Sequence, residues 1–443
     1  MKNQKTIIIE NVLVGLTVSF VALSLGAAFG LLSGRGAFSG MISAGVIAII
    51  TSVFGGTKVQ CSGPTAPMTS IIAVVVAAAS LDPYLQEANI NPDHFINIVL
   101  FMTGFLLMII AAFRLAKFIN MVPHVVISGF MSGIALLIWS DQIQKLFGWG
   151  GKKALEGSLL LNVGVTVTTV VLIFILPHIF HKMRNKYLML IPATLVALVI
   201  MTVLSNILNL PIEYIKLSGH LSSFADFKML ISEQWPSNVT MPILLLALPF
   251  AVQLAVLCYL DTLLTAMIVD KLTKTKTKSN QELFAQGLGN CAVGFLGGIP
   301  GAQATIRSVL MIKENATLRM AGILVGVFTL IQMILFQDWI TLIPQAVFTG
   351  ILIKVGYDVF DFQPIRMYLK GICQNRLRRS PKILFSYDEP YFNVSHREIF
   401  IVVGTSLVTV FFNLNLAVGL FTVLFYVFNK ILFTQKPMRD LKE

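Results

Sequence analysis

One carboxylate lies inside a long apolar stretch, and it is the residue best suited to ion chemistry. Asp261 falls about two-thirds of the way along the hydrophobic run 241–269. A charged side chain at membrane depth is costly, so it must face a cavity or a partner. Thr265 follows one helical turn later on the same face. The two side chains form half of a site for a hard cation such as sodium, whereas the carboxylate alone can carry a proton. A purely structural alternative is pairing of Asp261 with Arg307.

Two segments rich in Gly and Pro interrupt apolar stretches in the two halves of the chain. The first break covers residues 59–69 and the second covers residues 297–307. Breaks at matching places in two halves are typical of the binding site of a secondary transporter. Each break predicts a half-helix that starts inside the bilayer, where its free N–H groups and positive dipole end attract an anion. The alternative is a pair of packing kinks, because Gly and Pro are common in membrane helices.

Polar side chains near the two breaks are candidate anion ligands. Thr65 and Thr69 offer hydroxyl groups at the first break, and Thr305 offers one at the second. Each hydroxyl can instead bond back to its own helix. Arg307 lies one turn into the second half-helix and adds positive charge, unless it snorkels toward the membrane surface. Gln303 is a weaker candidate of the same kind.

The composition is that of a helical membrane protein. Of the 443 residues, 56% are hydrophobic and 12% are charged, with a mean hydropathy of +0.81. Soluble domains carry about 25% charged residues. The net charge of +12 reflects Lys and Arg in short loops, so we expect no nucleic-acid partner. Walker A, HExxH and GxSxG motifs are absent from the sequence, so we expect neither an enzyme nor ATP-driven transport, and no cofactor.

Hydropathy predicts fourteen membrane segments, seven in each half of the chain. They run roughly over residues 11–32, 37–55, 64–79, 95–113, 124–146, 159–178, 188–208, 241–269, 281–298, 302–313, 317–336, 341–356, 397–412 and 415–433. Most Lys and Arg clusters then fall on one side, which predicts cytoplasmic termini in the cell membrane. An odd number of segments in each half makes the second half an inverted repeat of the first.

The predicted domain boundaries follow from this count. Residues 1–215 form the first repeat and residues 241–435 form the second. An extracellular connection covers residues 216–240, and a short cytoplasmic tail covers residues 436–443. The connection 360–396 is long and basic, and ordinary topological charge explains it better than a specific contact with anionic lipid.

Several ordered motifs resemble those of one known family. In the first half they are the stretch Gly15–Gly30, then Phe54-Gly-Gly56, then Ser62-Gly-Pro-Thr-Ala-Pro-Met-Thr69. In the second half they are Asp261-Thr-Leu-Leu-Thr265, the stretch Asn280–Asn290, and Gly297-Gly-Ile-Pro-Gly-Ala302 through Arg307. Their order and spacing resemble the SulP family of anion transporters over nearly the whole chain.

The resemblance implies a fold and a function. The fold would be all-α, with fourteen segments in two inverted repeats of the kind shared with uracil transporters. Segments 1–4 and 8–11 would form a core, and segments 5–7 and 12–14 a gate. Family members carry sulfate, bicarbonate, chloride, oxalate or dicarboxylates, usually as dimers, so the implied partners are a small inorganic anion, membrane lipid and a second copy of the chain.

The resemblance also assigns roles to residues. The anion would sit between the starts of segments 3 and 10, near Thr69, Ala304 and Thr305. Asp261 occupies a position that is often Glu in proton-coupled members. Asp there, followed by Thr265, resembles the sodium-coupled bicarbonate members.

In those members, sodium would complete its shell with the carbonyl of Gln303 and with Thr305. Three departures from the family pattern bear on these roles. Ser24 stands where members often have Pro, so we expect segment 1 to differ at the anion site. Gln303 replaces a residue that is usually small, so we expect its side chain to crowd the site. The sequence ends at Glu443, soon after the last predicted segment, so we expect no STAS domain.

The leading hypothesis is therefore a secondary transporter of a bicarbonate- or sulfate-class anion, coupled to sodium through Asp261 and Thr265, with the core moving against the gate. A proton-coupled symporter of sulfate or dicarboxylate and a passive anion channel or exchanger are the alternatives. A nucleobase transporter is disfavoured, because the start of segment 10 carries Arg307 and no carboxylate.

Overall fold

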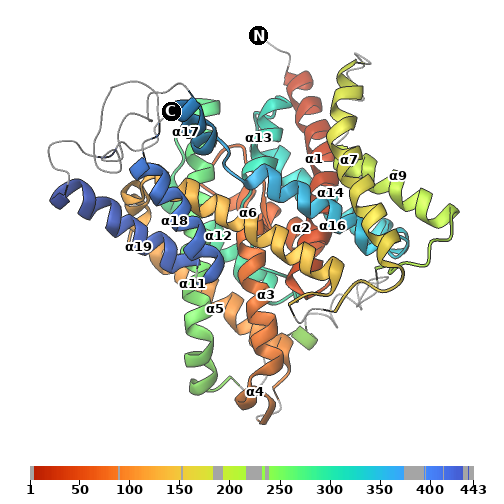
Figure 1. Ribbon diagram of the computed structural model, residues 1–443, viewed down its shortest axis with the longest axis horizontal. Helices are drawn as coiled ribbons and strands as arrows, with labels where there is room; N and C mark the ends of the chain where they lie inside the picture. The colour runs from red at the N-terminus through yellow and green to blue at the C-terminus, as the bar shows by residue number, and fades with distance from the viewer. Residues whose placement is uncertain are drawn as a thin grey trace. The chain divides into compact units, whose positions relative to one another are not determined.

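The computed structural model is predominantly helical (Figure 1). It describes residues 4–87, 90–150, 153–182, 193–215, 232–234, 239–373, 394, 396–412, 414–432 and 438. Most of the predicted connection 216–240, the centre of the basic connection 360–396 and nearly all of the tail 436–443 lie outside these residues.

Each of the fourteen predicted segments coincides with a described helix. The corresponding helices are α1 (Gln4–Ser33), α2 (Ala37–Phe54), α3 (Ala66–Leu81), α5 (Pro92–Ala112), α6 (His124–Phe147), α7 (Leu159–Lys182), α9 (Ala193–Ile207), α11 (Met241–Thr273), α12 (Ser279–Gly294), α13 (Thr305–Lys313), α14 (Arg319–Leu335), α16 (Gln345–Val359), α18 (His396–Phe411) and α19 (Leu414–Val427). Shorter helices are α4 (Pro83–Glu87), α15 (Gln337–Ile340) and α17 (Gln363–Cys373). The number of membrane crossings and the inverted repeat stay predictions.

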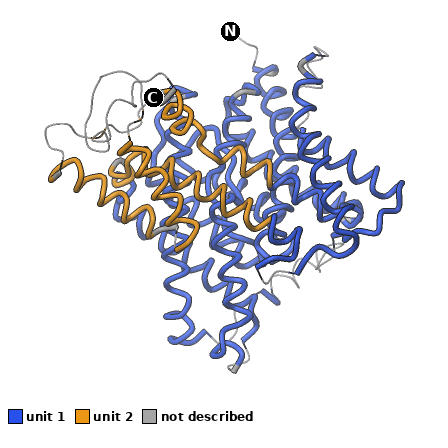
Figure 2. The backbone as a smooth tube through the Cα atoms, viewed as in Figure 1, with its two compact units in different colours: residues 1–117, 143–352 blue, residues 118–142, 353–443 orange. Residues whose placement is uncertain are grey.

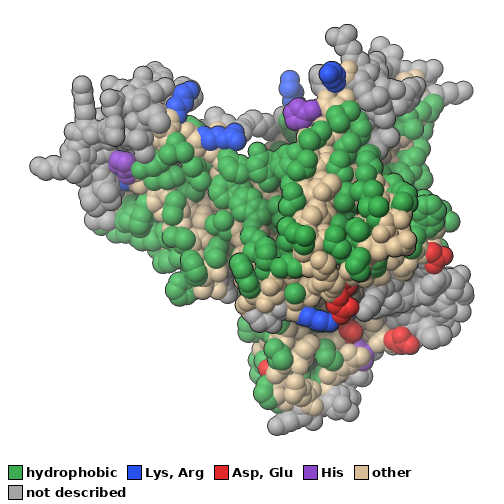
Figure 3. All heavy atoms as spheres, turned by 45° about the vertical axis from the view of Figure 1, so that its right-hand side comes forward, with side chains coloured by type: hydrophobic (Ala, Val, Ile, Leu, Met, Phe, Trp, Pro, Cys, Tyr) green, Lys and Arg blue, Asp and Glu red, His purple; other side chains and the backbone are tan. Residues whose placement is uncertain are grey.

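The chain is an integral membrane protein. Within the described residues, six helices are long and apolar enough to cross a membrane, namely α1, α2, α5, α6, α7 and α11. In the space-filling view, hydrophobic side chains cover most of the described surface that faces the reader (Figure 3). Such a surface suits contact with lipid chains, because exposing so much apolar surface to water is unfavourable.

The chain divides into two compact units (Figure 2). Unit 1 comprises residues 1–117 and 143–352, and unit 2 comprises residues 118–142 and 353–443. Every residue predicted to contact the anion or the cation belongs to unit 1. In unit 2, the Ser406 hydroxyl donates to the Gly129 carbonyl at 2.8 Å and ties α18 to α6. Predicted repeat and gate boundaries are not tested by this division.

Glycine pairs allow the helices of unit 1 to approach closely. A Cβ on Gly287 of α12 would lie 2.6 Å from the carbonyl oxygen of Gly104 in α5, and the reverse substitution would meet the Gly287 oxygen at 2.4 Å. Gly45 of α2 and Gly326 of α14 are related in the same way. Small residues at such crossings are the usual means of packing helices in membranes, where contact between backbones replaces the hydrophobic effect. These crossings fix α2, α5, α12 and α14 around the two breaks.

A short antiparallel ribbon joins the two breaks. Strand β1 (Ser62–Gly63) pairs with β2 (Ala302–Gln303), with Ser62 opposite Gln303 and Gly63 opposite Ala302. Helix α3 begins three residues after β1 ends, and α13 begins two residues after β2 ends. The starts of the two half-helices are therefore held together by the ribbon, as the paired breaks predicted.

Candidate functional site

The start of α3 carries a hydroxyl that is directed at the membrane carboxylate. Thr65 is the N-cap residue of α3, with extended backbone angles, but its side chain makes no cap hydrogen bond. Its Oγ1 instead donates to Oδ2 of Asp261 at 2.7 Å. A threonine at this position ordinarily satisfies an N–H group of its own helix. Because Thr65 is used elsewhere, the α3 start lacks a side-chain cap and keeps its capacity to bind an anion.

The start of α13 is arranged in a related way. Its N-cap residue is Ala304, which has no side chain able to cap the helix. The next residue, Thr305, approaches Thr265 of α11, and their Oγ1 atoms are 2.5 Å apart. Thus α11 contacts both half-helices, through Asp261 at one and through Thr265 at the other. The four side chains supply a carboxylate and three hydroxyl oxygens, which are ligands that sodium accepts.

Arg307 is buried beside the ribbon and does not snorkel. Its side chain is 1% exposed, and its Nη2 donates to the Pro64 carbonyl at 2.9 Å. Its Nη1 has no hydrogen-bond partner. Arg307 and Asp261 interact electrostatically, yet they form no direct ion pair among the described contacts. Both N–H bonds of Nη1 are therefore available next to the two helix starts.

Thr69 and Gln303 are both fully buried. The Thr69 hydroxyl donates to the Thr65 carbonyl at 2.7 Å, which is the bond back to its own helix considered above. To contact an anion, the Thr69 O–H would have to turn from the Thr65 carbonyl and donate to the anion, and that contact stays a prediction. The backbone N–H of Gln303 faces the Thr262 hydroxyl of α11 at 3.4 Å. The Gln303 amide has no partner for either its nitrogen or its oxygen.

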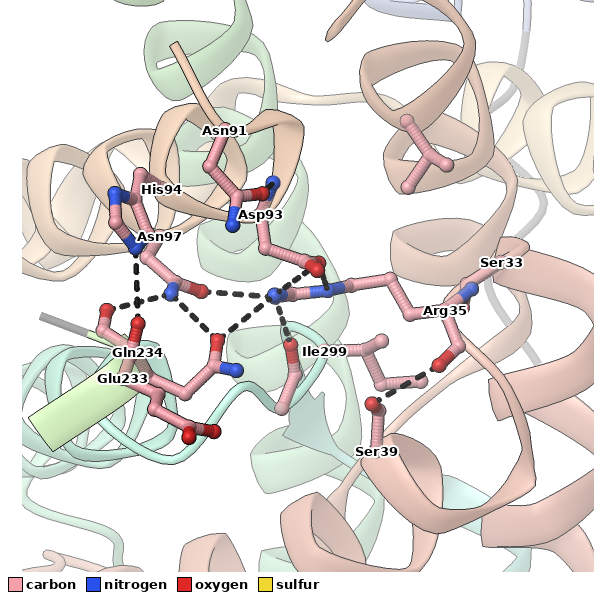
Figure 4. Close-up of polar contacts among 12 residues, drawn as sticks. Ser33, Arg35, Ser39, Asn91, Asp93, His94, Asn97, Glu233, Gln234 and Ile299 are labelled. Atoms are coloured by element: carbon pink, nitrogen blue, oxygen red, sulfur yellow. Dashed lines mark hydrogen bonds and ion pairs between the residues drawn. The ribbon is translucent and has the colours of Figure 1, made fainter. Parts of the chain in front are cut away.

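A buried arginine holds the second break from one end of the unit (Figure 4). Arg35, between α1 and α2, donates through Nη1 to the Gly298 carbonyl at 2.7 Å and to Asn97 Oδ1 at 2.9 Å. Its Nε and Nη2 both donate to Asp93 at the start of α5. Burial lowers the pKa of Arg35, and the charge of Asp93 opposes that shift. Nη2 also lies 3.5 Å from Gln234 Oε1.

These contacts fix the approach to β2. Ile299 is anchored next to Gly298, because its N–H donates to the Ser43 hydroxyl of α2 at 2.7 Å. The preceding Gly297 adopts a φ of 63°, in the left-handed region that favours glycine. Consequently Arg35 and Ser43 together determine how the chain enters the ribbon.

Sequence reasoning found the two helix starts but missed their supports. Arg35, Thr262 and Glu282 were not singled out as candidates. Arg35 carried a recognisable signal, since it is a lone cation between two apolar stretches and is flanked by glycines. Thr262 carried no such signal, because a hydroxyl inside a membrane helix usually bonds to its own backbone.

The profile of the sulfate permease family matches residues 8–371. The chain belongs to this family. It is 34% identical over 365 residues to the bicarbonate transporter BicA of Picosynechococcus sp., covering 79% of this chain and 61% of that protein. The putative sulfate transporter YvdB of Bacillus subtilis is 27% identical, with 95% of this chain and 73% of that protein covered.

Two solved structures share the fold of this chain. The transmembrane domain of a cyanobacterial BicA superposes with a TM-score of 0.74 at 27% identity, covering 94% of this chain and 99% of that one. The murine anion transporter Slc26a9 in an inward-facing state gives a TM-score of 0.73 at 16% identity, over 95% of this chain and 69% of that one, and shares the fold. The all-α membrane fold expected from the sequence is confirmed. These relatives are named as transporters, which agrees with the expectation of a non-enzymatic protein.

Proposed function

We propose that this chain is a secondary active transporter of a small inorganic anion of the bicarbonate or sulfate class, driven by symport with sodium. The observation that carries the proposal is the meeting of two uncapped helix starts with a buried, incompletely paired Arg307. Helix N-termini and a guanidinium both favour negative charge. In this proposal the anion contacts Thr65, Thr69, Ala304, Thr305 and Arg307.

Sodium is the coupling ion in this proposal. Asp261 and Thr265 supply a carboxylate and a hydroxyl from one face of α11, and Thr305 supplies a second hydroxyl close to Thr265. The carbonyl of Gln303 completes the shell. Each ion favours binding of the other. Sodium neutralises the charge of Asp261 that would repel the anion, and the anion neutralises the charge of Arg307 that would repel sodium. A similar relative bears the name bicarbonate transporter, and for that reason bicarbonate is the first anion to test.

Transport proceeds by a movement of the core as one body. The support is that the proposed anion and cation ligands all come from α3, α11, β2 and α13, which belong to the predicted core segments 3, 8 and 10. A single body that holds both ions can carry them together, which is what coupling requires. We further propose that the protein functions as a homodimer in the cell membrane, with both termini in the cytoplasm.

Uptake into proteoliposomes tests the proposal. Purified protein is reconstituted, and accumulation of labelled bicarbonate and labelled sulfate is measured with an inward sodium gradient, an inward proton gradient or no gradient. Alkaline buffer keeps the bicarbonate label from escaping as carbon dioxide. We expect the sodium gradient to concentrate one of the two anions. Uptake that follows only the pH gradient would instead favour proton symport, and uptake that never exceeds equilibrium would favour a channel or exchanger.

A further inference from the structure

A second carboxylate, Glu282, is fully buried in unit 1 at some distance in sequence from the proposed ion ligands. It lies in the first turn of α12, where the helix dipole favours negative charge, and it is 0% exposed. Three donors surround it. The backbone N–H of Thr57 donates to Oε2 at 2.8 Å, the Gln60 amide donates to Oε2 at 3.1 Å, and the Gln286 amide donates to Oε1 at 3.1 Å.

The two amides bound to Glu282 converge on one residue of the ribbon. Gln286 Nε2 also donates to the Ser62 hydroxyl at 2.7 Å. The same hydroxyl donates to Gln60 Oε1 at 3.0 Å. Ser62 is therefore held on both sides by amides that Glu282 binds. Ser62 is the β1 residue that pairs with Gln303 of β2. The hydrogen bonds from the two amides to Ser62 therefore influence the register in which β1 pairs with β2.

The chemistry of the carboxylate determines the orientation of both amides. Both carboxylate oxygens of Glu282 accept hydrogen bonds, so each glutamine must turn its NH₂ group toward the carboxylate. Gln60 then presents its oxygen to the Ser62 hydroxyl, and Gln286 presents its remaining N–H. A glutamine at position 282 would offer an NH₂ group of its own to one of the three donors. At least one contact would then have to turn away, and the orientation of Ser62 would no longer be fixed.

The loop before β1 depends on the same end of α12. The Lys278 N–H approaches the Gly56 carbonyl at 3.4 Å, and the Thr57 hydroxyl lies 3.2 Å from that of Thr277. A Cβ on Gly56 would lie 2.1 Å from the Lys278 oxygen, so the two loops are in contact. The start of α12 thus contacts the loop that leads into the first break. In a similar way, Arg35, between α1 and α2, hydrogen-bonds to the second break.

We propose that Glu282 is a positioning residue of the transport site: through Gln60, Gln286 and Ser62 it sets the ribbon register that places the α3 and α13 starts. The proposal rests on the proposed function for its transport readout. Glu282 does not contact either transported ion. Its effect reaches both ion sites together, because Thr65 follows Ser62 by three residues and Thr305 follows Gln303 by two.

The test uses Glu282→Gln and Ser62→Ala, singly and combined, in the full-length protein in detergent and in proteoliposomes. We expect each single variant to raise the half-saturating concentrations of anion and of sodium in parallel, by about tenfold if one well-formed hydrogen bond is lost. The double variant should add little to either single variant, because both act through one contact chain. Glu314→Gln, at the half-buried end of α13, is the matched control and should leave both values unchanged.

Hydrogen–deuterium exchange supplies a readout that needs no transport. Peptides covering residues 59–69 and 299–307 should exchange faster in Glu282→Gln than in the wild type, while peptides of α14 should not. If the wild type shows no sodium-driven uptake, the proposed function fails and the exchange result still judges the positioning role. If Glu282→Gln folds poorly, Ser62→Ala carries the test. Normal half-saturation and normal exchange in Ser62→Ala, or fully additive effects in the double variant, would overturn the proposal.

Discussion

The Thr65 hydroxyl donates a 2.7 Å hydrogen bond to Asp261, so the residue that starts α3 is bonded to the carboxylate in the middle of α11. An ordinary N-cap threonine would have bonded to its own helix. The contact joins the proposed anion site to the proposed cation site through a single pair of atoms. A change in the charge of Asp261 therefore alters the hydrogen bond to Thr65 at the start of α3. This contact gives a direct physical route for coupling between the two ions.

Replacement of Asp261 by Asn should abolish gradient-driven uptake while the protein still folds. The amide keeps the shape of the side chain and can still accept from Thr65, but it removes the negative charge that a coupled cation requires. Uptake under a sodium gradient and elution on size exclusion are the measurements. Undiminished concentrative uptake by the variant would remove Asp261 from the coupling site.

Replacement of Thr265 by Val should raise the sodium concentration needed for half-maximal uptake. Valine keeps the branched shape but removes one oxygen ligand and the contact with the Thr305 hydroxyl. Thr265→Ser retains the oxygen and should behave like the wild type. The measurement is uptake as a function of sodium at saturating anion. An unchanged sodium dependence in the valine variant would remove Thr265 from the sodium shell, whereas uptake that follows only the pH gradient would favour proton coupling.

Replacement of Thr69 by Val should raise the KM for the anion by about tenfold, as expected if a bond worth ~1.4 kcal/mol is lost. The Thr69 hydroxyl is buried next to the α3 start, and in this prediction its O–H turns from the Thr65 carbonyl to donate to the anion. Thr69→Ser is the matched control, since it keeps the hydroxyl. A KM that is equally normal in both variants would place the anion elsewhere.

Replacement of Arg307 by Gln should weaken anion binding more than Thr69→Val does. The variant removes a buried positive charge whose Nη1 has no partner within the protein. Hydrogen bonds from charged donors are roughly twice as strong as neutral ones. Arg307→Lys keeps the charge without the planar fork and should fall between the wild type and the Gln variant. Anion titrations at fixed sodium make the comparison, and equal affinities in all three proteins would contradict it.

Replacement of Gly287 by Ala should destabilise the protein by about 1–3 kcal/mol, a typical cost of overpacking. The added Cβ would lie 2.6 Å from the Gly104 carbonyl oxygen and would force α5 and α12 apart. Gly164→Ala is the control, because no atom lies within 4 Å of the Cβ that it adds. Thermal unfolding in detergent gives the comparison. A Gly287→Ala protein as stable as the control would show that this crossing is not tight.

Much of the site could be predicted from the sequence because its components are chemically unusual at membrane depth. Asp261 stands out as a charge in an apolar run, and Gly and Pro mark both breaks. The supports of the site could not be predicted in the same way. That Gln303 would pair with Ser62 in a short ribbon could not be read from the sequence, and the expected crowding of the site by its amide stays a prediction.

The class of the protein, a helical membrane protein, follows from its sequence. The length of each apolar run and the charges that flank it specify membrane helices, because both can be read from a short stretch of sequence. The tertiary structure alone decided which hydroxyl meets which carboxylate. Thr65 and Asp261 are 196 residues apart, and Thr57 and Glu282 are 225 residues apart. Contacts at such separations depend on how closely α2, α5 and α12 pack, and helical periodicity does not encode the crossing points or the ribbon register that this packing sets.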